Sequence, residues 1–163
     1  MIGAGISWDG SVYTVEEHNI PVCEPGSKVV FPNGDTFRYV KAQAAKTKGL
    51  AYGIDENYEV SSTGIVKTGN YSLIGFPVAT TSAPASGYTY KYFWIQTAGN
   101  LARVETSAAV ADNAQVYTTA TAGKLDDGDA SGAKIVGMKF TTAAGSATNT
   151  TAFLANEVGV VAA

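Results

Sequence analysis

The sequence offers few side chains that could perform acid–base or nucleophilic chemistry. His18 is the only histidine, and it follows Glu16 and Glu17 near the start of the chain. A serine–histidine–carboxylate site would need distant residues to converge on this segment, and no Gly-x-Ser-x-Gly motif is present. Cys23, the single cysteine, has no basic neighbour in sequence and is more typical of a small buried side chain than of a nucleophile. These residues predict a protein that is not an enzyme.

The best candidate for a metal site is the polar run that begins at Asp127. Asp127, Asp129 and Ser131 place oxygen atoms at positions one, three and five of a calcium-binding loop, and Gly132 follows at position six. Position twelve, where such loops carry a bidentate glutamate, is Met138. Since a polar turn between two strands explains the run equally well, we predict neither a metal nor another cofactor and leave a cation at Asp127 and Asp129 open.

One stretch of the chain combines basic and aromatic side chains, the arrangement that stacks the bases of single-stranded nucleic acids. Its cations are Arg38, Lys41, Lys46 and Lys48, and its aromatic residues are Phe37 and Tyr39. The whole chain has 11 basic and 14 acidic residues and a net charge of −3, which argues against binding by bulk charge. We therefore expect a solvated face or half of a protein–protein contact, and no nucleic-acid partner.

The chain also lacks the apolar segments that membranes require. No stretch approaches the roughly 20 apolar residues that cross a bilayer, so we expect no membrane partner. The first ten residues have no basic residue and no continuous apolar core, so they do not resemble a secretory signal.

Residues 88–97 form the strongest predicted strand, and it is apolar on both faces. One face carries Tyr88, Tyr90, Tyr92 and Trp94, and the other carries Phe93 and Ile95. The aromatic face is either a sugar-binding surface or, as its apolar content favours, a surface that packs on the core. A strand with two apolar faces is central in a sandwich or covered by a neighbouring subunit. Phe93 and Ile95 are therefore candidate contacts with a partner.

The elements that would position these residues are predominantly strands. The 163-residue chain contains 24 Val and Ile but only 5 Leu, a composition that favours sheets over helices. Turn signals, including residues 32–35 and 98–100, separate about ten short strands, with residues 107–115 as a possible short helix. We predict one all-β sandwich or barrel-like domain over residues 21–163. A faint internal repeat suggests two related β units, about 34–87 and 88–163.

Residues 1–20 predict an extended arm that precedes this domain. The segment contains Gly3, Gly5 and Gly10, which make it costly to order alone. Its apolar side chains are spaced too widely for a helix, and we expect a capsid or a neighbouring subunit to cover them; they are Ile2, Ile6, Trp8 and Tyr13. The alternative is that the arm folds back on its own domain as an edge strand.

Several segments together resemble the decoration proteins, also called cement or head-stabilising proteins, that coat the capsids of tailed bacteriophages. The segments are residues 34–42, 92–99, 102–104, 115–127 and 135–137. They match a strand near the start of such proteins, a strand of the form Y-x-W-V-Q-T-x-G with the residues after it, a hairpin rich in threonine, and a strand ending in glycine. These motifs specify strands and turns rather than chemistry, so no catalytic residue carries over.

The resemblance implies a structural virion protein on the outer capsid surface, made in the cytoplasm of the host bacterium. Such a protein would bind between subunits of the major capsid protein and stabilise the shell against internal DNA pressure. It also implies a homotrimer, with a dimer as the alternative. Two other functions stay open: a carbohydrate-binding or receptor-binding β module, and another virion part such as a tail-tube or head-completion protein.

Overall fold

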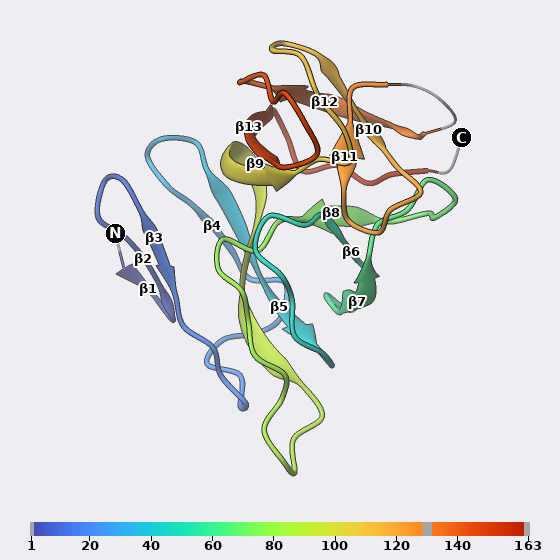
Figure 1. The fold of residues 1–163 in the computed structure, drawn as a ribbon. Coiled ribbons are helices and arrows are strands. Elements are labelled where there is room, and N and C mark those ends of the chain that lie inside the picture. Colours follow the sequence, from blue (N-terminus) through green and yellow to red (C-terminus); the bar gives the residue numbers. More distant parts are fainter. Residues whose placement is uncertain (1, 129–131, 162–163) are drawn as a thin grey trace.

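The computed structural model describes residues 2–128 and 132–161 and shows that these residues form three β-sheets with no helix (Figure 1). The strands are β1 (Ile2–Gly3), β2 (Ile6–Trp8), β3 (Tyr13–Val15), β4 (Lys28–Val30), β5 (Thr36–Ala42), β6 (Tyr52–Ile54), β7 (Val60–Gly64), β8 (Leu73–Gly75), β9 (Lys91–Glu105), β10 (Gln115–Thr118), β11 (Leu125–Asp126), β12 (Lys134–Phe140) and β13 (Asn149–Leu154). The sheet orders are β1-β2-β3, β11-β10-β12-β13-β9-β5-β4 and β7-β6-β8, and neighbouring strands are antiparallel. The predicted all-β, sandwich-like fold is confirmed.

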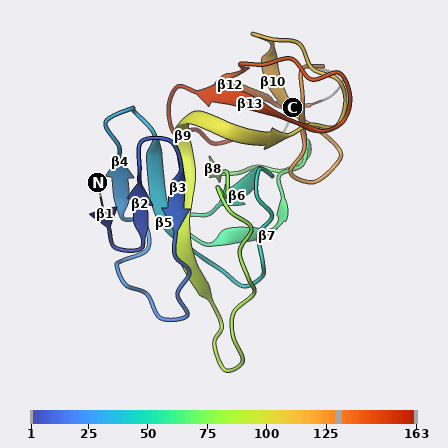
Figure 2. The ribbon, with the colours of Figure 1, turned by 60° about the vertical axis from the view of Figure 1, so that its left-hand side comes forward.

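Strand β9 organises the molecule because its first half pairs with β5 and its second half pairs with β13. The sequence predicted a turn at residues 98–100 and two separate strands, and that prediction was wrong. Gly99 has a φ of 99°, beside a register shift between β5 and β9, so the chain bends there without reversing. The bend directs the second half of β9 across the other end of the molecule, where β12 and β13 lie (Figure 2). Strand β9 lies entirely within the proposed unit 88–163, and its first half pairs with β5 of the proposed unit 34–87.

The two apolar faces of β9 are both covered by the chain itself. Trp94 packs on one face in a cluster with Ile6, Phe31, Phe37 and Tyr39. On the other face, Phe93 and Ile95 pack against residues of the β7-β6-β8 sheet. A third and larger core lies under the second half of β9, among β10, β12 and β13; its members include Leu101, Val104, Val116, Met138 and Phe140. Strand β9 is therefore central, as one of the two alternatives predicted.

The N-terminal segment does not form the extended arm that the sequence predicted. It folds into the β1-β2-β3 sheet and lies against β4 and β5 (Figures 1 and 2). Gly5 and Gly10 have φ values of 79° and 102°, so the glycines expected to hinder ordering provide the positive φ of the two turns. Trp94 fixes the first turn, since its Nε1 donates a hydrogen bond of 2.6 Å to the carbonyl oxygen of Ala4.

Two local predictions had different outcomes. The turn at residues 32–35 is confirmed, because it joins β4 to β5 with Gly34 at a φ of 90°. The short helix considered for residues 107–115 is absent. Instead, Val110 forms an isolated antiparallel bridge with Ala144, and both backbone hydrogen bonds of that bridge are 2.9 Å long. Pairing with a distant segment thus overrides the helix propensity of an alanine-rich stretch.

Candidate functional site

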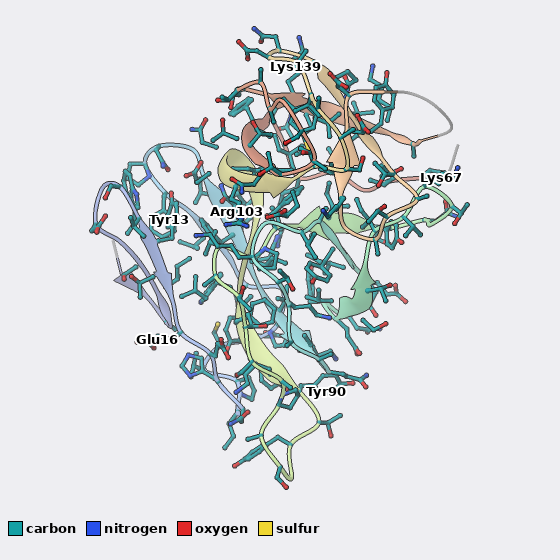
Figure 3. The ribbon with its side chains drawn as sticks, viewed as in Figure 1. Tyr13, Glu16, Lys67, Tyr90, Arg103 and Lys139 are labelled. Atoms are coloured by element: carbon teal, nitrogen blue, oxygen red, sulfur yellow. The ribbon has the colours of Figure 1, made fainter. Side chains whose placement is uncertain are left out.

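A groove of about 420 Å³ lies between the N-terminal sheet and the second half of β9. It is lined from several elements at once: the β2–β3 hairpin, the β4–β5 turn, the loop near residue 48, β9 and β13. The lining residues that carry the argument below are Trp8, Tyr13, Lys48, Asn100, Ala102 and Arg103, and we call this the Trp8–Arg103 groove. Tyr13 and Arg103, labelled in Figure 3, extend from β3 and β9.

One wall of the groove is aromatic. Trp8 and Tyr13 are cross-strand partners in the β2–β3 pair, so their side chains lie on the same face of the small sheet. Their rings are stacked, with centroids 6.0 Å apart and an interplanar angle of 19°. Behind them, Tyr13 contacts Phe37 at 4.6 Å and Phe31 at 5.0 Å between ring centroids. The core thus supports two half-buried rings that border the groove.

A buried carboxylate, Asp35, fixes the polar end of the groove. Its Oδ1 accepts the backbone N–H of Asn100 at 2.7 Å, and its Oδ2 accepts the Tyr13 hydroxyl at 2.6 Å and the Asn33 Nδ2 at 2.8 Å. Burial and the hydrogen bond to Asp35 raise the pKa of the Tyr13 phenol well above its usual value. The hydroxyl therefore stays protonated, and it ties the N-terminal hairpin to the β4–β5 turn and to β9.

The sequence predicted Trp8 and Tyr13 as contacts with a capsid or a second subunit, which stays a prediction, and it gave no expectation for the polar side of this groove. Asn33 and Asp35 were interpreted only as turn residues, and Asn100 as part of a turn that does not exist. The sequence contains a partial signal for this contact. Asn33 and Asp35 lie in a turn just before β5, and Gly99 and Asn100 lie on β9, the strand that pairs with β5. Only the β5–β9 register shows that the two segments meet.

Of the other predicted contact residues, three are enclosed by the chain. Phe93 and Ile95 are fully buried and Ile6 is 2% exposed, so none of them reaches a partner while this fold is intact. Ile2 lies in β1, but its side chain is outside the described part of the structure. The prediction that Ile6, Phe93 and Ile95 contact a capsid or a second subunit is therefore corrected, because intramolecular sheets cover them.

His18 and Cys23 form no catalytic arrangement with the residues around them. His18 Nε2 lies 3.8 Å from the Glu16 carboxylate, and among the described residues this nitrogen has no hydrogen-bond partner. Its backbone forms two hydrogen bonds with Tyr92, which anchor the segment after β3 to the start of β9. Cys23 packs beside the aromatic core, where burial raises the pKa of its thiol. His18 thus takes part in backbone pairing, and Cys23 takes part in core packing.

The acidic run near residue 127 serves local structure where it is described. Asp126 Oδ1 accepts the backbone N–H of Asp127, and Asp127 Oδ2 accepts that of Ala111 at 2.7 Å. Asp129 and Ser131, the other two oxygen donors of the calcium-loop hypothesis, lie outside the described residues. Within residues 2–128 and 132–161, no group of three His, Cys, Asp or Glu side chains is arranged to hold a metal ion.

The basic stretch does not form one surface. Arg38 is paired with Glu157, and Lys41 lies over the Tyr90 ring with its Nζ 4.9 Å from the centroid. Lys46 is fully buried, with its Nζ donating to the carbonyl oxygen of Ser61 at 2.6 Å. Only the exposed Lys48 belongs to the groove.

The aromatic face of residues 88–94 is not an open binding surface either. Trp94 is 5% exposed, because the N-terminal sheet covers it, and Tyr92 packs at the edge of the same cluster. Tyr88, by contrast, is largely exposed in the loop before β9. The core-facing interpretation is correct for Trp94.

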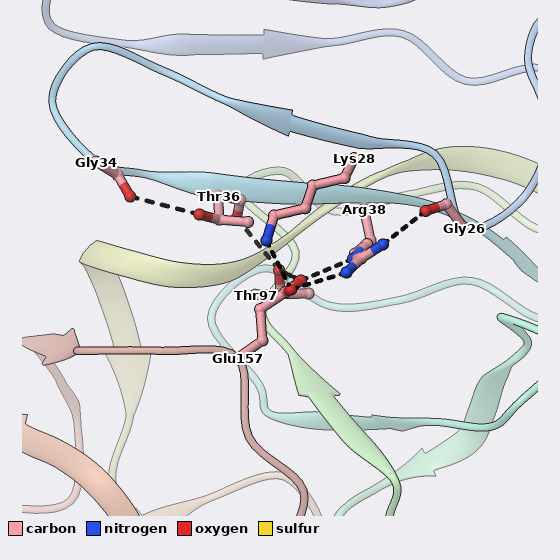
Figure 4. A network of polar contacts seen from close by, with 7 residues as sticks. All are labelled: Gly26, Lys28, Gly34, Thr36, Arg38, Thr97 and Glu157. Carbon is pink, nitrogen blue, oxygen red and sulfur yellow. Dashed lines mark hydrogen bonds and ion pairs between the residues drawn. The ribbon is translucent and has the colours of Figure 1, made fainter.

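A partly buried ion cluster closes the opposite side of the large sheet. The carboxylate of Glu157, after β13, accepts hydrogen bonds from Arg38 Nε at 2.8 Å, Arg38 Nη2 at 2.9 Å, Lys28 Nζ at 3.1 Å and Thr97 Oγ1 at 2.7 Å (Figure 4). Burial opposes ionisation, but these donors prevail and lower the pKa of the carboxyl to about 2. The cluster fastens the C-terminal segment to β4, β5 and β9.

Comparison with known proteins does not add a family. A scan of protein-family models finds no match to this chain, and a search of curated proteins finds no significant match. In the described part of the chain there is also no helix that is long and apolar enough to span a bilayer.

Proposed function

We propose that this chain is a structural virion protein that binds the outer surface of a phage capsid between major capsid protein subunits and stabilises the shell. One observation carries the proposal. The segments that resemble decoration proteins fall on β5, β9, β10, β11 and β12, and these strands belong to one seven-stranded sheet. Segments spread over a hundred residues of sequence thus form a single structural unit, as motifs shared through a common fold would.

The contacts that hold the two terminal segments support a role in withstanding the internal pressure of a capsid. Tyr71 and Val160 exchange two backbone hydrogen bonds of 2.7 and 2.8 Å, and Glu157 binds β4, β5 and β9 of the seven-stranded sheet. At the other end, the N-terminal sheet is held through Tyr13 and Trp94. Long-range contacts of this kind oppose local opening of the fold. A protein on a pressurised shell requires such resistance.

The expected homotrimer, with a dimer as the alternative, rests on the resemblance alone. The apolar residues on both faces of β9 were a second reason to expect an oligomer. Both faces are covered within the chain, so this reason no longer applies. Large apolar side chains remain exposed elsewhere. Val136 on β12 is 66% exposed and Phe153 on β13 is 42% exposed, and we propose this pair as a contact with the capsid or with a second subunit.

Mass spectrometry of purified particles from the source of this sequence tests the proposal. We expect a copy number of the same order as that of the major capsid protein, as required for a component that occupies repeated sites over the shell. A chain absent from particles, or present in only a few copies, would contradict it. Ring-shaped assemblies in negative-stain images would instead favour a tail-tube or head-completion protein.

A variant pair then tests the contact surface. Phe153→Asp should abolish decoration of particles while leaving the thermal stability nearly unchanged, because the side chain is substantially exposed. Lys134→Gln, an exposed change on β12 that preserves the apolar pair, is the matched control. Normal decoration by Phe153→Asp would exclude this surface.

The proposal includes no catalytic activity. A panel of esterase, glycosidase and nuclease assays should give no signal above background. A positive result that disappears in a His18→Ala variant with unchanged stability would refute this part of the proposal.

A further inference from the structure

We propose that the Trp8–Arg103 groove binds a saccharide that carries one carboxylate group. This inference is independent of the proposed capsid role, since it uses only the chemistry of the groove and can be tested on the isolated chain. The site differs from the sugar-binding surface that the sequence suggested, because Trp94 is covered by the N-terminal sheet.

The shape and apolar surface of the groove suit a pyranose ring. A volume of about 420 Å³ lies within the usual range of small-molecule sites and accommodates one or two sugar rings. Trp8 and Tyr13 are half-buried and supported from behind by Phe31 and Phe37, so their positions are fixed before a ligand arrives. A rigid aromatic wall can pack against the C–H face of a sugar at little entropic cost.

The polar groups that remain available are neutral amides and hydroxyls, which match the hydroxyl groups of a sugar. The exposed Asn100 side chain offers a donor and an acceptor. On the β12–β13 side, the Thr151 hydroxyl bonds both Thr141 at 2.7 Å and Thr142 at 2.8 Å, and the exposed Thr141 hydroxyl can make a further hydrogen bond. Together these groups lie at two edges of the groove, as needed to orient a polyhydroxylated ring.

The charge of the groove favours an anionic ligand although the whole chain is acidic. Both oxygens of Asp35 are already bonded within the protein, and this residue is only 2% exposed. Arg103 is paired with Glu105, with Nη2 and Oε1 separated by 2.6 Å. The Lys48 ammonium has no ion-pair partner among the described residues and is exposed at the groove, so one positive charge is left for one carboxylate.

A pair of matched sugars tests the inference. The full chain would be titrated with methyl β-D-glucuronide and with methyl β-D-glucoside, followed by tryptophan fluorescence and by saturation-transfer NMR. Because the two sugars differ only at C6, where the glucuronide has a carboxylate and the glucoside a hydroxymethyl group, we expect the glucuronide to bind at least about tenfold more tightly, as a charge-assisted hydrogen bond predicts. The Trp8 emission should change on binding.

Three variants separate a specific site from a non-specific one. Lys48→Gln should reduce the preference for the glucuronide to about one, and Lys134→Gln, which does not line the groove, should leave it unchanged. Ala102→Trp should abolish binding of both sugars, because Ala102 is an exposed lining residue and the indole would fill the groove without altering the core.

The outcomes that would overturn the inference are distinct from failure of the capsid role. No saturable binding of either sugar at millimolar concentration would refute it, as would a preference that survives Lys48→Gln. Tighter binding of a short peptide with one glutamate would assign the groove to a peptide instead. Decoration of particles does not enter any of these measurements.

Discussion

Neutralising Glu157 should remove a large part of the stability of this fold, and the loss should depend on pH. The carboxyl has a pKa of about 2 in the folded chain, against an ordinary value of 4.5. The interval between these two values corresponds to about 3 kcal/mol of stabilisation in the ionised state. The Glu157 side chain is 18% exposed, but Lys28 is 44% exposed and its contribution is screened, so we expect about 2–3 kcal/mol for Glu157→Gln at neutral pH.

The sign of the pH dependence follows from the depressed pKa. The folded chain holds the carboxylate ionised where the unfolded chain would protonate it, so the stabilisation is complete above pH 4.5 and is lost as the pH falls from 4.5 toward 2. Urea unfolding of wild-type and Glu157→Gln chains, followed by tryptophan fluorescence at pH 7, 5 and 3, measures this directly. The difference between the two chains should be largest at pH 7 and pH 5 and smaller at pH 3.

Glu56→Gln is the matched control, since it removes an exposed carboxylate that has no ion-pair partner among the described residues. It should change the free energy of unfolding by less than about 0.5 kcal/mol at every pH. A Glu157→Gln effect below about 0.5 kcal/mol at pH 7, or one that is equally large at pH 7 and pH 3, would refute the argument from the ion cluster.

Three further predictions follow from other parts of the fold. Gly99→Ala should lower the free energy of unfolding by about 2 kcal/mol or more, because the new Cβ would overlap Asp35 at a positive φ. Gly10→Ala, at a similar φ but in open space, should lower it by only about 1 kcal/mol, and equal losses of unfolding free energy in urea would contradict this. Ile6→Ala should lower the free energy of unfolding by about 2–4 kcal/mol, and an unchanged Tm in calorimetry would show that the N-terminal sheet lies outside the cooperative core. Burial lowers the pKa of Lys46 from 10.5, so the folded chain releases this proton more readily than the unfolded chain. The stability of wild type relative to Lys46→Met should therefore rise from neutral pH toward pH 10.5, and a difference that stays constant with pH would contradict the lowered pKa.

Local sequence patterns were enough to predict the fold class and many of the elements. A high content of β-branched residues and repeated turn signals predicted strands, and the predicted strand over residues 36–42 coincides with β5. These signals are local: alternation, side-chain branching and turn chemistry act within a few residues and do not depend on distant parts of the chain. For the same reason the strand predicted over residues 88–97, with two apolar faces, was recognisable as central or covered.

The way in which these elements combine depends on contacts between distant parts of the chain. The pattern around Gly99 is the same for a tight turn and for a bend in a continuous strand, and the hydrogen bond from Asn100 to Asp35, 65 residues away, favours the bend. Likewise, the sequence could not choose between an extended arm and a folded one, because the burial of Ile6 depends on surfaces contributed by β4, β5 and β9. The groove between these parts exists only after they pack, since each wall comes from a different sheet and no single segment encodes it.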